Sequence, residues 1–124
     1  MIEVDPIILR YLSSCRNGKF SNRHVSFSHP AHEKTVAAVV EYNRRTNNTE
    51  RFLDLKTAIT MIENGSLPDR VTLLLCTGTV IEHEGHKIVP CIVKNQNGHG
   101  PTYHVGFRRE DQTVGRGYAV GVFQ

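Results

Sequence analysis

The sequence lacks the short motifs that mark several common enzyme classes. It contains no Gly-x-Ser-x-Gly elbow for a serine nucleophile and no Gly-x-x-x-x-Gly-Lys-Ser/Thr loop for nucleotide phosphates. It also contains no helical His-Glu-x-x-His arrangement and no closely spaced cysteine pair, which are common zinc-binding patterns. We therefore expect no catalytic residues, no cofactor and no metal site.

Cysteine and long hydrophobic runs are scarce as well. The three cysteines are an odd number, and Cys76 and Cys91 lie in apolar, strand-like runs, which predicts buried thiols rather than disulfides. No run approaches the roughly 18 apolar residues that a membrane-spanning helix needs. Asp5 and Pro6 interrupt the first apolar residues, which argues against a signal peptide. We expect a soluble, cytoplasmic protein with no membrane partner.

Length and charge further limit the classes of protein to which the chain can belong. A chain of 124 residues with 39% hydrophobic content predicts a single domain over residues 1–124. The net charge of +3, from 15 basic and 12 acidic residues, is too small for a protein that coats DNA or RNA, so no nucleic-acid polymer is expected as a partner. The sequence pI near 8.9 is compatible with an anionic ligand.

Hydrophobic periodicity predicts helices in the first half of the chain. Three segments have apolar residues at helical spacing and plausible start and stop signals. They cover residues 5–17, 28–43 and 54–64, and a short alternating strand is expected at 24–27.

From residue 70 onward the pattern is typical of strands. They are expected at residues 71–76, 79–81, 87–93, 102–108 and 118–123, with a turn at Glu84-Gly85 and Pro90 at a strand edge or bulge. This order predicts an α+β fold in which N-terminal helices (about 1–66) pack on a C-terminal antiparallel β-sheet (about 70–124).

Residues 94–109 are the strongest candidate for a ligand site. A polar segment with several glycines leads directly into a strand that carries aromatic rings and ends in two arginines. Amides and imidazoles suit base edges, rings suit stacking, and guanidinium groups suit phosphate. The candidate ligand-binding residues are Asn95, Asn97, His99, Tyr103, Phe107, Arg108, Arg109 and Arg116.

Simpler interpretations exist for the same residues. Strand alternation places Tyr103, Val105, Phe107 and Arg109 on one side and Thr102, His104 and Arg108 on the other. The two rings would stack a base only if a partner subunit covers them, and otherwise they belong to the core. The arginines would be ordinary solvated charges near Glu110 and Asp111, and the asparagines would be turn residues.

The seven histidines raise two further hypotheses. The pairs His29/His32 and His83/His86 are weak metal-binding signals because no cysteine pair and no helical His-Glu-x-x-His arrangement accompanies them. The segments at 24–26 and 104–106 resemble the paired His-x-Ser/Thr strands of two-histidine phosphoesterases, in which one imidazole acts as base and the other as acid. Gly106 departs from that pattern because the phosphate-binding hydroxyl is missing.

From about His29 onward, the chain resembles the phage anti-Thoeris proteins. The resemblance rests on YNRRT at 42–46, TAITMIENG at 57–65, VPCIVK at 89–94 and GHGPTY at 98–103. The resemblance is moderate in coverage, and none of these strings is a mechanistic fingerprint.

The resemblance implies a function without catalysis. Proteins of this family sequester cyclic ADP-ribose isomers made by bacterial TIR-domain enzymes, and so block anti-phage signalling in the host cytoplasm. It also implies a homo-oligomer with pockets between subunits, and related sponges suggest a second kind of site for cyclic oligonucleotides. The alternative that the sequence leaves open is the two-histidine phosphoesterase acting on a cyclic phosphate or nucleotide.

Overall fold

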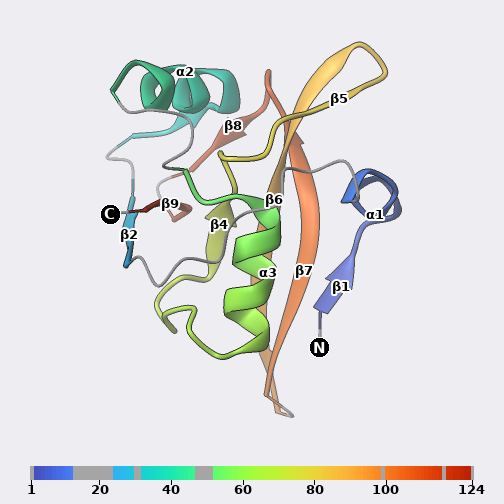
Figure 1. Ribbon diagram of the computed structural model, residues 1–124, viewed down its shortest axis with the longest axis vertical. Helices are drawn as coiled ribbons and strands as arrows, with labels where there is room; N and C mark the ends of the chain where they lie inside the picture. Colours follow the sequence, from blue (N-terminus) through green and yellow to red (C-terminus); the bar gives the residue numbers. More distant parts are fainter. Residues whose placement is uncertain are drawn as a thin grey trace.

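The computed structural model describes residues 2–12, 24–29, 32–46, 52–98, 100–115 and 117–123. Its main sheet has seven strands in the order β1-β7-β6-β4-β9-β2, with β5 paired to β6, and β3 and β8 form a separate two-stranded sheet (Figure 1). The strands are β1 (Ile2–Val4), β2 (Val25–Ser28), β3 (Lys34–Thr35), β4 (Leu73–Leu75), β5 (Ile81–His83), β6 (His86–Asn97), β7 (Gly100–Arg109), β8 (Thr113–Val114) and β9 (Ala119–Phe123). The helices are α1 (Pro6–Tyr11), α2 (Val36–Thr46) and α3 (Leu55–Glu63).

Helix α3 has the boundaries that the sequence predicts. The Asp54 carboxylate accepts the Thr57 N–H at 3.3 Å and the Thr57 hydroxyl at 2.6 Å, which caps the first turn. The helix ends at Asn64, and Gly65 follows with φ of 74°. None of the described helices is long and apolar enough to span a membrane.

Helices α1 and α2 are shorter than predicted. Asp5 caps α1 by accepting the Ile7 N–H at 2.9 Å, but the helix ends at Tyr11. Helix α2 begins at Val36, whose N–H donates to the Gln112 carbonyl oxygen at 2.9 Å. Thr35 also caps the helix locally, because its hydroxyl accepts the Ala38 N–H at 3.2 Å, so the start of α2 combines a local cap with a tertiary contact to a distant turn.

The α+β class is confirmed, but the sheet is mixed rather than antiparallel throughout. β1 runs parallel to β7, from Ile2↔Tyr103 to Val4↔Val105, and β4 runs parallel to β9. Strands β1, β2 and β3 also lie within the part of the chain that was expected to be helical, although β2 agrees with the strand predicted at 24–27.

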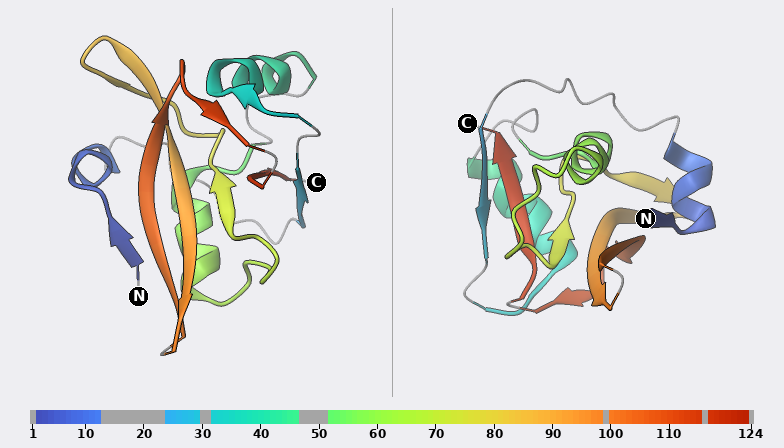
Figure 2. Two further views of the ribbon diagram at one scale, coloured as in Figure 1. Left: turned by 180° about the vertical axis from the view of Figure 1, so that it is seen from behind. Right: turned by 90° about the horizontal axis from the view of Figure 1, so that it is seen from below.

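Two tight hairpins arrange the strands around β6. At the β5–β6 turn, Glu84 and Gly85 have φ of 50° and 79°, as a type I′ turn requires. The β6–β7 ladder continues to Asn97↔Gly100 and forms a long ribbon that is visible from behind in Figure 2. Residues 94–97, predicted to be loop, are therefore strand.

The two faces of the sheet bury separate apolar clusters. On the first face, Leu74, Ile92 and Val105 pack with Ile8 of α1 and Ala58 of α3, among others. On the second face, the cluster joins the sheet to α2 and to Tyr118, and its members are Val36, Val39, Leu75, Val89, Cys91, Val114, Tyr118 and Val120. Cys76 and Cys91 are buried thiols, as predicted.

Pro90 lies inside β6 rather than at a sheet edge. Its carbonyl oxygen accepts the Cys76 N–H at 2.9 Å, so its nitrogen faces the same side of the strand. This point falls between the segment of β6 that pairs with β5 and the segment that pairs with β4. The missing N–H is tolerated there because neither ladder needs it.

Candidate ligand-binding face of strands β6 and β7

The predicted alternation along β7 is confirmed, and one side of the strand belongs to the core. Val105 is fully buried, and Tyr103 and Phe107 are partly buried against the first apolar cluster. In a single chain, the structure therefore supports the interpretation of these rings as core residues better than the interpretation as stacking residues. Stacking of a base between Phe107 and a partner subunit stays a prediction.

The opposite side of β7 is polar and open. Thr102, His104, Gly106 and Arg108 follow one another on this side, and Asn95 of β6 lies directly across from Thr102. His104, Arg108 and Asn95 are exposed, and the Thr102 hydroxyl donates to the Asn95 carbonyl oxygen at 3.4 Å. We call Asn95, Thr102, His104 and Arg108 the polar face.

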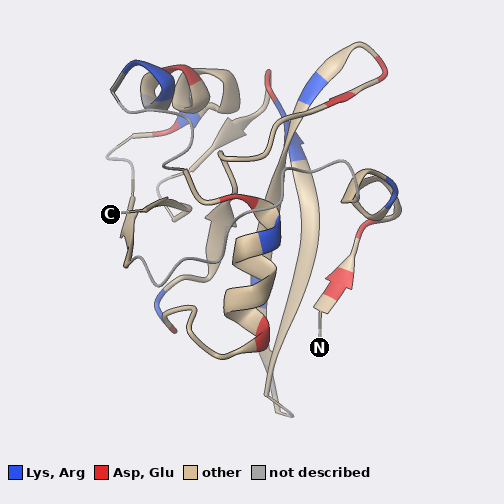
Figure 3. Cartoon of the chain, in the orientation of Figure 1, with Lys and Arg blue, Asp and Glu red and all other residues tan. Residues whose placement is uncertain are grey.

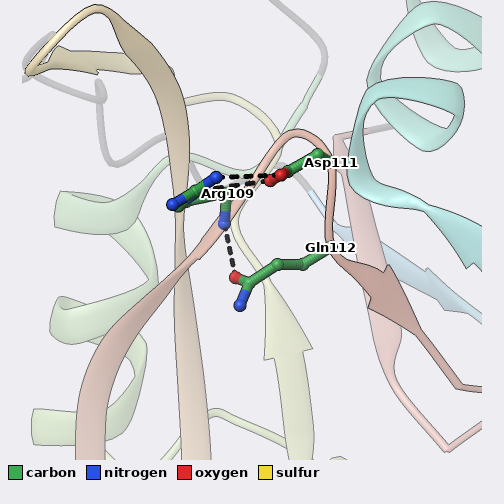
Figure 4. Close-up of polar contacts among 3 residues, drawn as sticks. All are labelled: Arg109, Asp111 and Gln112. Atoms are coloured by element: carbon green, nitrogen blue, oxygen red, sulfur yellow. Dashed lines mark hydrogen bonds and ion pairs between the residues drawn. The ribbon is translucent and has the colours of Figure 1, made fainter.

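Arg109 points into the turn that follows β7 (Figure 4). Its Nε and Nη2 donate to the two carboxylate oxygens of Asp111 at 3.2 and 2.9 Å, and its backbone N–H donates to Gln112 Oε1 at 2.8 Å. The hydrogen bond from Arg109 lowers the pKa of Asp111. A phosphate would have to compete with this carboxylate, whereas Arg108 forms no ion pair among the described residues.

The other sequence-predicted residues are only partly brought together. Asn97 pairs with Gly100 at the far end of the hairpin, three positions beyond Lys94. His99 and Arg116 lie outside the described residues. Among the predicted residues whose side chains the structure describes, Asn95 and Arg108 share one open surface.

Three residues on or beside this surface were not predicted as ligands, namely Thr102, His104 and Glu3. His104 was assigned to the correct side of the strand, but only the phosphoesterase hypothesis used it. Glu3 on β1 pairs with His104 in the parallel register, and its Oε2 lies 4.0 Å from His104 Nδ1. Nothing local in the sequence links residues so far apart.

The structure separates the two histidines of the phosphoesterase hypothesis. His24 precedes β2, and β9, β4 and β6 lie between β2 and β7 in the sheet. Four interstrand steps of about 4.8 Å place the two strands roughly 19 Å apart. β2 and β7 also lie on opposite sides of the molecule in Figures 1 and 2. His24 and His104 therefore do not flank one phosphate.

The remaining titratable groups give no metal site. Within the described parts of the chain, no group of three or more His, Cys, Asp and Glu side chains could hold a metal ion. His83 instead contacts Tyr11, with Nδ1 3.5 Å from the hydroxyl oxygen.

Burial raises the pKa of the Cys91 thiol, and the neighbouring Arg108 guanidinium opposes that rise. Cys91 is therefore a neutral thiol at physiological pH.

Charge is distributed unevenly around the polar face. Figure 3 shows basic residues toward the end of β7 that leads to β8, and an acidic residue on the adjacent β1. Of the basic residues at this end of β7, Arg108 lies on the polar face, whereas Arg109 lies on the other side and is paired with Asp111. The Arg108 end of the polar face therefore favours an anionic group.

Comparison of the chain with protein-family models, with curated proteins and with solved structures finds no match.

Proposed function

We propose that the protein binds a cyclic nucleotide of the cyclic ADP-ribose class and holds it without transforming it. The observation that carries this proposal is the division of side chains on β7. Its aromatic side packs against the core, and its other side, together with Asn95 of β6, presents a hydroxyl, an imidazole, a guanidinium and an amide. These groups offer hydrogen-bond partners for phosphate, ribose and base.

The spacing of the polar face suits a ligand of this size. Successive side chains on one side of a strand are about 6.6 Å apart, so His104 and Arg108 are separated by about 13 Å at their backbones. The arginine end is suited to a pyrophosphate, and the Asn95 and Thr102 end is suited to ribose hydroxyls or a base edge.

Sequestration requires more enclosure than one open face provides. A protein that competes with a receptor must remove most of its ligand from water, and a flat strand surface covers only one side. We therefore propose a homo-oligomer in which a second subunit completes the pocket, in keeping with the resemblance to the anti-Thoeris sponges. A separate site for cyclic oligonucleotides would belong to the same proposal.

The proposal is tested by recovery of intact ligand. The purified protein is incubated with each cyclic ADP-ribose isomer, freed of unbound ligand, and heated, and the supernatant is analysed by mass spectrometry. We expect one isomer to return unchanged. Linear ADP-ribose in the supernatant, formed at a rate that depends on His104, would instead establish an enzyme.

The oligomeric state is tested separately by light scattering. A dimer or a larger assembly at micromolar concentration is expected. A monomer that still binds the ligand tightly would contradict the shared pocket, while leaving the binding activity in place.

A further inference from the structure

We infer that His104, Gly106 and Arg108 form an oxyanion subsite on the second face of the sheet, which takes a phosphate or pyrophosphate group. This inference rests on the proposed function for the identity of the whole ligand, but its geometry is independent of that identity. The sequence predicted phosphate contacts for the arginines at this end of the hairpin, Arg108, Arg109 and Arg116, and the inference selects Arg108 from them.

The imidazole of His104 already leans over Gly106. A Cβ placed on Gly106 would lie 3.7 Å from both Cδ2 and Nε2 of His104. The other ring nitrogen, Nδ1, is the one nearest Glu3 on β1. The ring is therefore oriented with Nε2 toward the open backbone at Gly106.

Arg108 approaches the same point from the other end of the strand. Its guanidinium lies against the thiol of Cys91, and Cys91 is the residue directly across from Gly106 in the β6–β7 ladder. Arg108 is exposed on its outer side and forms no ion pair within the described residues. Its remaining N–H groups are available to an external acceptor.

Gly106 provides the space between the two side chains. Any larger residue there would fill the gap that His104 and Arg108 border. An oxyanion in this gap would accept hydrogen bonds from an N–H of the His104 ring and from the Arg108 guanidinium, which is the pairing that phosphate oxygens favour. Glu3 lies at the opposite ring nitrogen, with Oε2 4.0 Å from Nδ1, so Nε2 is the nitrogen that faces the gap.

Inorganic pyrophosphate is the probe for this subsite. Its binding is followed by isothermal titration calorimetry and by 31P NMR with the wild type and with Arg108→Gln, His104→Gln and Gly106→Ala. We expect Arg108→Gln to weaken binding about tenfold or more, because a charged hydrogen-bonding partner is removed. Gly106→Ala is expected to weaken binding by filling the gap, while the protein still folds, because a Cβ there makes only ordinary contacts.

Arg44→Gln is the charge-matched control. Arg44 is an exposed residue of α2 whose guanidinium lies 3.8 Å from Glu41, so the substitution removes one positive charge away from β7. Binding that falls equally in Arg44→Gln and Arg108→Gln would indicate general electrostatic attraction and overturn the subsite. Absence of pyrophosphate binding to the wild type, even in large excess, would also overturn it.

The same variants separate this subsite from the proposed function. If a cyclic ADP-ribose isomer binds Arg108→Gln and Gly106→Ala as tightly as the wild type, the subsite is refuted and the proposed function stands. If pyrophosphate binds in the expected variant-dependent way but no cyclic ADP-ribose isomer binds, the subsite stands and the proposed function fails. Circular dichroism of each variant establishes that the protein is folded.

Discussion

Replacing Tyr118 by phenylalanine is expected to stabilise the protein. Tyr118 is fully buried beneath α2, and its hydroxyl has no hydrogen-bond partner among the described residues. Its neighbours in the second apolar cluster include Val36, Val39 and Val120, which have no polar side-chain atoms. The hydroxyl therefore loses its hydration on folding without a compensating bond.

The size of the effect follows from that loss. Leaving a buried hydroxyl unpaired costs about 1–3 kcal/mol, and phenylalanine keeps the ring and nearly all of its packing. We expect Tyr118→Phe to raise the free energy of unfolding by about 1 kcal/mol or more. For a chain of this length, that corresponds to a rise in Tm of roughly 3–5 °C.

Urea denaturation followed by circular dichroism measures the change. The denaturation midpoint should rise while the slope with urea stays constant, because the surface exposed on unfolding is nearly unchanged. Tyr11→Phe is the matched control, since the Tyr11 hydroxyl contacts His83 Nδ1 at 3.5 Å. The control should lose about 0.5–1 kcal/mol or change little. A loss of 1 kcal/mol or more in Tyr118→Phe would show that its hydroxyl is paired in solution, and would refute the reasoning.

Three further predictions concern other parts of the fold. Gly78→Ala should lower the free energy of unfolding by about 1–3 kcal/mol in the same urea assay, because a Cβ at Gly78 would overlap the Phe52 carbonyl oxygen; an unchanged midpoint would contradict this. Phe107→Ala is judged by its melting curve and by ligand titration. Loss of stability would assign the ring to the core, whereas binding weaker by about 1–3 kcal/mol with the fold intact would assign it to stacking. A variant that changes neither would remove Phe107 from both roles. Burial raises the folded-state pKa of Cys91 and Tyr118 above their ordinary values of 9.0 and 10.0, so the unfolded chain releases these protons first as the pH rises. The free energy of unfolding should therefore be insensitive to these two groups below pH 8 and should fall as the pH rises past 9 to 10. Cys91→Ala should reduce the fall, and an unchanged pH profile would argue against burial of the thiol.

Local signals account for the elements that the sequence predicts well. Asp54 and Gly65 bound α3 through a cap and a positive φ, and both effects depend on neighbours within a few residues. The Glu84-Gly85 turn is set in the same way by its own backbone angles. The burial of Cys76 also follows from an apolar run that is visible in the sequence.

The elements that were missed depend on distant partners. β1 pairs with β7 in parallel, and such pairing leaves no local pattern in a three-residue strand. Residues 94–97 are polar, so they look like a loop, yet their backbones continue the ladder to Gly100. For the candidate site, the predicted alternation along β7 correctly placed Arg108 and Phe107 on opposite sides of the strand. The pairing of Arg109 with Asp111 agrees with the alternative in which acidic turn residues neutralise the arginines, whereas nothing in the sequence showed that Glu3 lies beside His104.

The parallel pairing of β1 with β7 has a consequence for folding during synthesis. Ile2, Glu3 and Val4 can reach their places only after Tyr103, His104 and Val105 have been made, so β1 cannot pair until β7 is complete. Contacts between such distant residues form slowly because a long loop must close. Glu3 is therefore expected to reach its place beside His104 late, and an incomplete nascent chain would carry the β6–β7 hairpin without this carboxylate.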